Sequence, residues 1–225
     1  MKTSSSNSDF PVLIQDFFCE RLMNQQNVSP KTIAAYRDTF RLLIGYLGTS
    51  MKRSASAITL ADLDAPNILG FLDHLETERQ NSIRTRNARL AAIRAFLKYA
   101  ALYSPTSLPT IQRVLAIPTK RFQPPCLTFL SRTEMEAILA APDTSRWSGQ
   151  RDRVMLATMY NTGARVSEII SLRIADVTLT PSASVRIQGK GRKLRVVPLW
   201  RKTAKQIGQW LKHISQDPET PLFPN

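Results

Sequence analysis

Apolar residues recur at intervals of three and four along the first hundred residues, a spacing that predicts amphipathic helices. Ser29 followed by Pro30 is typical of a helix N-cap and first helical position. Thr59 and Asp62 have the spacing of a capping box at a further helix start. Short connections between helices favour a small bundle. Its four predicted helices cover residues 10–25, a segment beginning at 29, a segment beginning near 59, and residues 82–102.

The helical pattern is interrupted after the first hundred residues. Residues 103–125 hold five of the 14 prolines, which predicts a linker with at most one helical turn, around residues 112–115. Beyond it, Ser131 and Glu134 have capping-box spacing ahead of another apolar helix. Further helices are expected over about 149–160, in the segment after 163, and over about 202–214.

Strict alternation of apolar and polar residues appears only near the C-terminal end. Residues 185–187 and 194–196 alternate on either side of "QGKGRK", which predicts a β-hairpin with a glycine-containing turn. The predicted fold is therefore mainly α with a small antiparallel β-sheet. We expect a helical domain over residues 10–102, a linker over 103–125 and a mixed domain over 126–225.

The net charge of the chain indicates a class of binding partner. The chain has 31 Lys and Arg against 17 Asp and Glu, a formal net charge of +14, which favours a polyanion such as nucleic acid. Its two cysteines, Cys19 and Cys126, are far apart and indicate neither disulfides nor structural zinc. The N-terminus has no long apolar run, so we expect no signal peptide, no membrane span and a cytoplasmic protein.

The positive charge is concentrated in two stretches without any acidic residue, residues 81–133 and 177–216. One such stretch is a common solvated face, whereas two of this length favour contact with the phosphates of a duplex from two sides. The candidate DNA-binding residues are Arg84, Arg86, Arg94, Lys98, Lys120, Arg121, Arg192 and Lys193.

Arg165 and Lys190 are candidates for phosphate chemistry. Arg165 follows a glycine turn at the start of an apolar helix in "NTGARVSEIISLRIADV", residues 161–177, and Lys190 lies in the hairpin turn. A planar guanidinium can bind two phosphate oxygens, and a lysine at a turn can donate a proton to a leaving oxygen. The alternatives are a salt bridge between Arg165 and Glu168 at i,i+3 and an exposed turn lysine.

At these residues the sequence resembles the tyrosine recombinase family, which includes phage integrases and the Xer recombinases. "YNTGARVSEIISLRIADV" is similar to that family's first-arginine box, and "IQGKGRKLRVVPL" is similar to its lysine hairpin. "SPKTIAAYRDTFRLLIGYL" and "RTRNARLAAIRAFLKYA" resemble its N-terminal core-binding domain, a SAM-like helical bundle. The resemblance covers nearly the whole chain from about residue 10.

The resemblance implies roles for three residues. Arg165 matches the first catalytic arginine, which contacts the scissile phosphate, and Lys190 matches the catalytic lysine, a general acid toward the leaving 5′ oxygen. Glu168 matches the acidic position that orients the arginine. The family's reaction uses a tyrosine nucleophile with no metal and no other cofactor. Double-stranded DNA is the implied partner, and further recombinase protomers on the same DNA are candidate protein partners.

The chain departs from the family pattern after "LFP". The family continues into a His-x-x-Arg box, a further His or Trp and a nucleophilic tyrosine. All five tyrosines here precede Arg165, and His74 and His213 match no such box. Tyr160 belongs to the arginine-box pattern, which favours a packed side chain. We therefore expect a recombinase catalytic domain that is partial, with an incomplete active site.

Two function classes remain open from the sequence. The leading one is a DNA-binding protein of site-specific recombination or integration, inactive alone without the tyrosine and the second arginine. The alternative is a non-catalytic DNA-binding module that occupies recombination sites or regulates a full-length recombinase. RNA binding leaves the arginine box unexplained, and "GKGRK" is not a P-loop because G-x-x-x-x-G-K-[ST] is missing.

Overall fold

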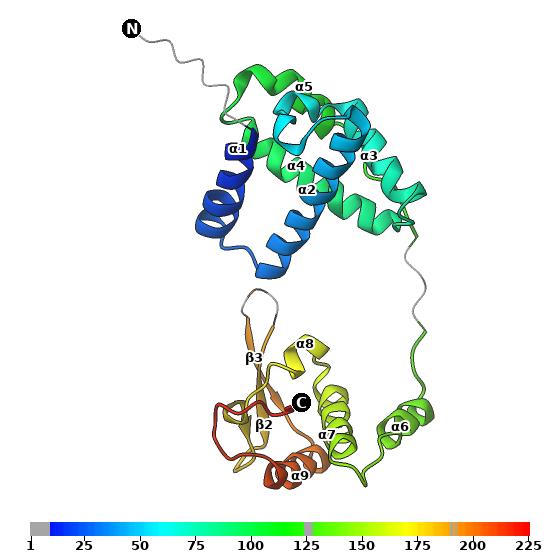
Figure 1. Cartoon of the computed structure of the whole chain (residues 1–225). Helices are drawn as coiled ribbons and strands as arrows, with labels where there is room; N and C mark the ends of the chain where they lie inside the picture. Colours follow the sequence, from blue (N-terminus) through cyan, green and yellow to red (C-terminus); the bar gives the residue numbers. More distant parts are fainter. Residues whose placement is uncertain (1–9, 124–127, 190, 192) are drawn as a thin grey trace. The chain divides into compact units, whose positions relative to one another are not determined.

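A computed structural model describes residues 10–123, 128–189, 191 and 193–225 (Figure 1). The chain divides into two compact units, residues 1–125 and 126–225, which we call the N-terminal and the C-terminal unit. The described part of the N-terminal unit consists of helices and the loops between them. Its elements are α1 (Phe10–Asp16), the π-helix η1 (Phe17–Gln25), α2 (Pro30–Met51), the 3₁₀ turns η2 (Ala55–Ala57) and η3 (Leu60–Asp62), α3 (Ala65–Thr77), α4 (Ile83–Ala100), the 3₁₀ turn η4 (Pro105–Ser107) and α5 (Leu108–Leu115).

Side-chain caps set where the main helices begin. The hydroxyl of Ser29 accepts a hydrogen bond from the Thr32 amide at 3.2 Å, as predicted for the start of α2. The Thr59–Asp62 capping box is also present, but it closes only the short turn η3. The longer helix α3 begins three residues later, where the Asp64 carboxylate caps the amide of Asn67 at 2.9 Å.

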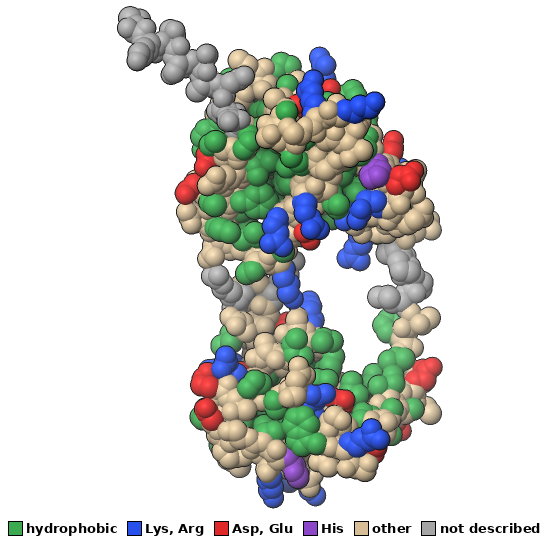
Figure 2. Space-filling model, viewed as in Figure 1, with side chains coloured by type: hydrophobic (Ala, Val, Ile, Leu, Met, Phe, Trp, Pro, Cys, Tyr) green, Lys and Arg blue, Asp and Glu red, His purple; other side chains and the backbone are tan. Residues whose placement is uncertain are grey.

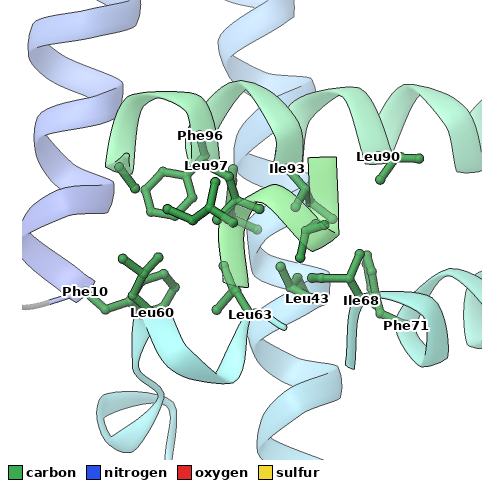
Figure 3. Close-up of a cluster of buried hydrophobic side chains, with 14 of the residues drawn as sticks. Phe10, Leu43, Leu60, Leu63, Ile68, Phe71, Leu90, Ile93, Phe96 and Leu97 are labelled. Atoms are coloured by element: carbon green, nitrogen blue, oxygen red, sulfur yellow. The ribbon is translucent and has the colours of Figure 1, made fainter. Parts of the chain in front are cut away.

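The core of the N-terminal unit is built around the apolar face of α4. Phe96 and Leu97 point from α4 toward the side chains that α1, α2 and the segment of η3 contribute, and both are fully buried (Figure 3). Phe96 packs edge to face on Phe10 and on Phe40, with ring centroids 5.9 and 5.2 Å apart. Such pairs add to the stabilisation from apolar burial alone.

The segment predicted as a linker, residues 103–125, is instead helical over η4 and α5. Ile111, Val114 and Ile117 are buried in the core of the N-terminal unit. The prolines were misread, because Pro105 and Pro109 each lie in the first turn of a helix, where proline costs no hydrogen bond. The prediction that this whole segment is a linker is therefore wrong for residues 105–117.

The C-terminal unit combines helices with a small antiparallel sheet, as the sequence predicted, and this sheet has three strands. The Ser131–Glu134 capping box is confirmed, with the Ser131 amide 2.7 Å from the Glu134 carboxylate. The elements are α6 (Arg132–Ala140), α7 (Trp147–Thr162), α8 (Val166–Ile169), the 3₁₀ turn η5 (Ile174–Asp176), β1 (Val177–Thr178), β2 (Ser184–Gln188), β3 (Leu194–Pro198), α9 (Arg201–Trp210) and the 3₁₀ turn η7 (Leu211–His213).

The predicted hairpin is confirmed as β2 and β3, in the strand order β1-β2-β3. Val185 and Ile187 of β2 are fully buried and pack with Ile169 of α8 and with Ile207 and Trp210 of α9. Strand β1 was not predicted, because two residues are too short to show an alternating pattern.

The segment after η7 packs back on this core. Leu222 is fully buried, its amide donates to the Leu172 carbonyl at 2.8 Å, and its carbonyl accepts from the Trp210 indole at 2.7 Å. In the parts of the chain that the structure describes, no helix is long and apolar enough to span a membrane.

Replacing Ile111 by alanine tests whether α5 belongs to the folded core. We expect Ile111→Ala to lower the free energy of unfolding of the N-terminal unit by about 2–5 kcal/mol, because it leaves a cavity among buried side chains. Urea unfolding followed by far-ultraviolet circular dichroism measures this loss. The exposed neighbour Gln112 is the control, and Gln112→Ala should change stability by less than about 0.5 kcal/mol. If the two variants are equally stable, α5 does not contribute to the folded core and is a linker.

Candidate active site and nucleic-acid interface

Arg165 occupies a defined position between two helices. Helix α7 ends at Gly163, which has a φ of 60°, a left-handed conformation that favours glycine. Ala164, the residue after this glycine, is buried. Arg165 then serves as the N-cap of α8, while its side chain remains 70% exposed. The glycine turn therefore presents a guanidinium to solvent from a fixed backbone position.

The carboxylate of Glu168 is the centre of this site. Its side chain is 6% exposed, and it receives hydrogen bonds from two arginines. Arg165 contributes its backbone amide at 2.9 Å and its Nη1 at 3.0 Å. Arg195 contributes its Nη2 at 2.7 Å and its Nη1 at 3.4 Å. The predicted pairing of Arg165 with Glu168 is thus present as part of a larger arrangement.

Arg195 is the site residue that sequence reasoning missed. It lies opposite Ile187 in the β2–β3 register, on the face of the sheet that otherwise carries buried apolar side chains. An arginine at an inward-facing strand position needs a carboxylate partner, because unpaired buried charge is strongly unfavourable. The sequence pattern did not identify it, because apolar Leu194 and Val196 flank Arg195 and favour an outward arginine, whereas the structure exposes both apolar side chains.

These contacts shift the ionisation of Glu168. The hydrogen bond from Arg195 is the largest cause that lowers the pKa of Glu168 from 4.5 to about 2, followed by the bond from the Arg165 amide. Burial acts in the opposite direction, and the side chain of Arg165 lowers the pKa further. The same hydrogen bond raises the pKa of Arg195. Glu168 is consequently ionised at neutral pH and pairs as a carboxylate with both arginines.

The hairpin turn approaches this carboxylate closely. A Cβ atom on Gly189 would lie 3.0 Å from Arg195 Nη1 and 3.3 Å from Glu168 Oε1. Only glycine allows this approach without displacing one of the two side chains. Lys190 and Arg192 lie outside the described residues, so their predicted roles stay predictions. The described residue at the start of their turn, Gly189, is nevertheless in contact range of the Glu168 site.

The basic residues of the N-terminal unit fall into two groups. Figure 2 shows Lys and Arg side chains along the lower edge of this unit and others at its top. Arg84, Lys98 and Arg121 are exposed, and so is Lys120, whose ammonium lies 2.8 Å from the Glu76 carboxylate. In the C-terminal unit, Lys193 is also exposed. These five of the predicted DNA-binding residues present their charge to solvent.

Arg86 and Arg94 have internal partners instead. Arg86 is 3% exposed, lies 3.3 Å from the Glu76 carboxylate and donates to the Pro118 carbonyl at 3.4 Å. Arg94 is half-buried and donates to the Ile117 carbonyl. The prediction that Arg86 contacts DNA is wrong, because its guanidinium is buried and holds the end of the α5 segment against α4. Arg94 makes the same kind of attachment.

Tyr160 and the metal-ligating residue types add no second site. Tyr160 is 46% exposed and packs edge to face on Trp200, with ring centroids 5.5 Å apart, beside a groove of about 380 Å³. Among the described residues, no group of three or more His, Cys, Asp or Glu side chains could hold a metal ion.

Comparisons with known proteins agree with this arrangement. Residues 128–225 match the phage integrase family, and residues 15–102 match the phage integrase N-terminal SAM-like domain. The putative integrase/recombinases y4rC and y4rD of Sinorhizobium fredii are 44% and 40% identical over 95% and 94% of this chain. Tyrosine recombinase XerC of Pelobacter propionicus is 32% identical over 91% of the chain. The chain belongs to the tyrosine recombinase family.

The chain is shorter than these relatives. It spans 64% of the length of y4rC, 76% of y4rD and 65% of the XerC protein. Among solved structures, XerH site-specific recombinase bound to palindromic difH substrate matches 98% of this chain and 68% of its own, with a TM-score of 0.65. At 22% identity this likeness confirms the fold, a SAM-like bundle and an integrase-type catalytic fold.

The low pKa of Glu168 predicts how its contribution to stability depends on pH. Since the folded-state pKa is depressed, the carboxylate stabilises the folded state above its ordinary pKa of 4.5, and this stabilisation is lost as the pH falls toward about 2. We expect Glu168→Gln to unfold at lower urea than wild type at pH 7, with the gap closing over that range.

Tryptophan fluorescence measures this gap in the C-terminal unit, because Trp147, Trp200 and Trp210, the chain's three tryptophans, all lie there. Glu219 pairs with Arg173 and is 72% exposed, so Glu219→Gln is the matched control and should show little gap at any pH. A Glu168→Gln gap that stays constant down to about pH 2 would contradict the assignment.

Proposed function

We propose that this chain is a DNA-binding protein of site-specific recombination whose C-terminal unit carries part of a tyrosine-recombinase active site. The observation that carries the proposal is the exposed guanidinium of Arg165, anchored by a buried carboxylate beside the hairpin turn. A guanidinium held in this way is suited to a phosphodiester, because two of its N–H groups can reach two non-bridging oxygens.

The proposed roles of the site residues follow from their chemistry. Arg165 binds the scissile phosphate and stabilises the charge that develops on it. Lys190 donates a proton to the leaving 5′ oxygen. Glu168 orients Arg165 through the amide and the guanidinium that it holds. The nucleophile in this family is a tyrosine, and no tyrosine follows Arg165 in these 225 residues.

The N-terminal unit has a surface suited to duplex DNA. Arg84 and Lys98 are exposed residues of α4, fourteen positions and about 21 Å apart, and they fall on nearly the same side of the helix. Ala88 and Ala91, also exposed, lie between them. Small side chains between two cations let the helix backbone approach a groove while the cations meet phosphates. XerH, the structural neighbour, is itself bound to DNA substrate, which supports this assignment.

We therefore propose the N-terminal unit, from α1 to α5, as a core-binding domain and residues 126–225 as part of a catalytic domain. Lys120, Arg121, Arg192 and Lys193 are proposed as additional phosphate contacts. Further recombinase protomers on the same DNA are the proposed protein partners.

A non-catalytic DNA-binding module is the second candidate. The observation that favours it is the pair of exposed cations on α4, Arg84 and Lys98, which can bind a duplex without any contribution from the Arg165 site. Both candidates require duplex binding, and they differ only in whether the Arg165 site acts on DNA once the missing groups are supplied.

Duplex binding should weaken steeply as salt increases. Each neutralised phosphate contributes about 0.9 to the slope of log affinity against log salt, so Arg84→Glu with Lys98→Glu should lower the slope by about 2. The double variant should weaken binding to all sequences alike. Fluorescence anisotropy with a labelled duplex between about 50 and about 200 mM salt measures both effects.

The control for charge reversal is Lys31→Glu with Lys52→Glu, which changes net charge equally at exposed positions near the two ends of α2, outside both acid-free stretches. Its slope should remain within experimental error of wild type. Equal slopes for the two double variants would show that only net charge matters and would remove α4 from the interface.

A polypeptide of these 225 residues should form no covalent adduct with DNA. Arg165 and Lys190 can hold a phosphate, but they do not replace a tyrosine oxygen in line with the scissile bond. A nicked suicide substrate and a denaturing gel test this. An adduct that disappears in Tyr160→Phe would overturn the reading and make Tyr160 the nucleophile. An adduct that appears after fusion to the C-terminal part of y4rD would favour the recombinase over the non-catalytic module.

A further inference from the structure

Glu168 has two arginine partners that are not equivalent. Arg195 directs both Nη atoms at the carboxylate, at 2.7 and 3.4 Å, and its side chain is 38% exposed. Arg165 uses one Nη atom, at 3.0 Å, and its side chain is 70% exposed. Among the hydrogen bonds of the described residues, this is the one that the Arg165 guanidinium makes. Arg195 is therefore the more firmly held partner, and Arg165 is the more exchangeable one.

This difference matters when Arg165 engages an anion. A buried carboxylate that loses its only counter-ion is strongly destabilised. If Arg165 were the sole partner of Glu168, a phosphate would have to compete with that carboxylate for the same guanidinium. With Arg195 in place, Glu168 keeps a charged, two-bond partner whether Arg165 points toward it or toward a ligand.

We propose that Arg195 is a positioning residue that keeps Glu168 neutralised, so that the guanidinium of Arg165 is available to bind a phosphate. The inference rests on the proposed function, because it assumes that Arg165 binds phosphate. It adds that the exposed guanidinium owes its availability to a residue on β3, a strand far from Arg165 in the sequence.

The position of Arg195 also joins two parts of the site. It lies on β3 two residues after Lys193, whose carbonyl accepts a hydrogen bond from the Gly189 amide at 2.7 Å across the base of the turn. The same residue therefore holds α8 through Glu168 and lies at the base of the hairpin turn. A purely structural role as a strut between β3 and α8 is the competing explanation.

The two explanations differ in what happens when Glu168 loses its charge. In the proposal, Arg195→Gln leaves Glu168 with free acceptor sites that capture Arg165, and Glu168→Gln in the same chain releases Arg165 again. In the structural explanation, the second substitution removes a further contact between β3 and α8 and lowers the affinity for phosphate still more.

The experiment uses the 225-residue chain with inorganic phosphate as the probe. Titrations are followed by the NMR chemical shifts of the amides of Arg165, Glu168 and Ile169, and tryptophan fluorescence verifies that each variant is folded. We expect Arg195→Gln to weaken phosphate binding on the order of tenfold, as for the loss of one charged hydrogen bond. Adding Glu168→Gln should restore affinity to within about threefold of wild type.

Two further variants provide a conservative replacement of Arg195 and a matched control. Arg195→Lys retains the cation with a single bonding direction and should bind phosphate with intermediate affinity, so it serves if Arg195→Gln does not fold. Arg186→Gln is the matched control, because Arg186 is a neighbouring strand arginine paired with Asp176 at 3.1 Å, and its loss should leave phosphate binding unchanged.

The outcomes separate the inference from the proposed function. If Arg165→Gln leaves the phosphate titration unchanged, Arg165 is not a phosphate ligand. Both the proposed function and the positioning role of Arg195 are then wrong. If Arg165→Gln abolishes binding while Arg195→Gln, or Arg195→Lys in its place, binds like wild type, the positioning role alone is overturned. A double variant that binds no better than Arg195→Gln also overturns it, in favour of the structural strut.

Discussion

The site in the C-terminal unit depends on the pairing of the buried Glu168 carboxylate with two arginines. It accepts hydrogen bonds from the backbone and side chain of Arg165 and from the side chain of Arg195. A single charge thereby joins the start of α8, the end of the hairpin and, through the close approach of Gly189, the turn between the strands. Because the carboxylate is ionised far below neutral pH, this junction is charged under all physiological conditions.

The basic residues of α4 serve two different purposes, and the burial of each side chain decides which. Arg86 and Arg94 direct their guanidinium groups at carbonyls of Pro118 and Ile117, so part of the positive charge of α4 holds the chain that leaves α5. Arg84 and Lys98 lie on the same helix with their charge in solvent. A high net charge alone does not separate these groups.

Local sequence rules predicted much of this fold because they depend on neighbouring residues. Ser29 and Ser131 cap helices where expected, and period-two alternation located the hairpin. The same rules failed where a segment is stabilised by distant contacts. Residues 105–117 looked like a proline-rich linker, yet Ile111 and Val114 complete a core that other helices supply. Thr59 marked a real capping box, but the long helix begins at Ala65.

The sequence by itself determined the family, the helical and hairpin segments and the pairing of Arg165 with Glu168, because each of these depends on residues close together in the chain. Only the tertiary structure decided that Arg195 shares the Glu168 carboxylate and that Arg86 is buried rather than available to DNA. Arg195 is 27 residues from Glu168, and Arg86 is 32 from Pro118. No local pattern specifies such a contact, since it arises when the β-hairpin docks on α8 and when α5 packs against α4.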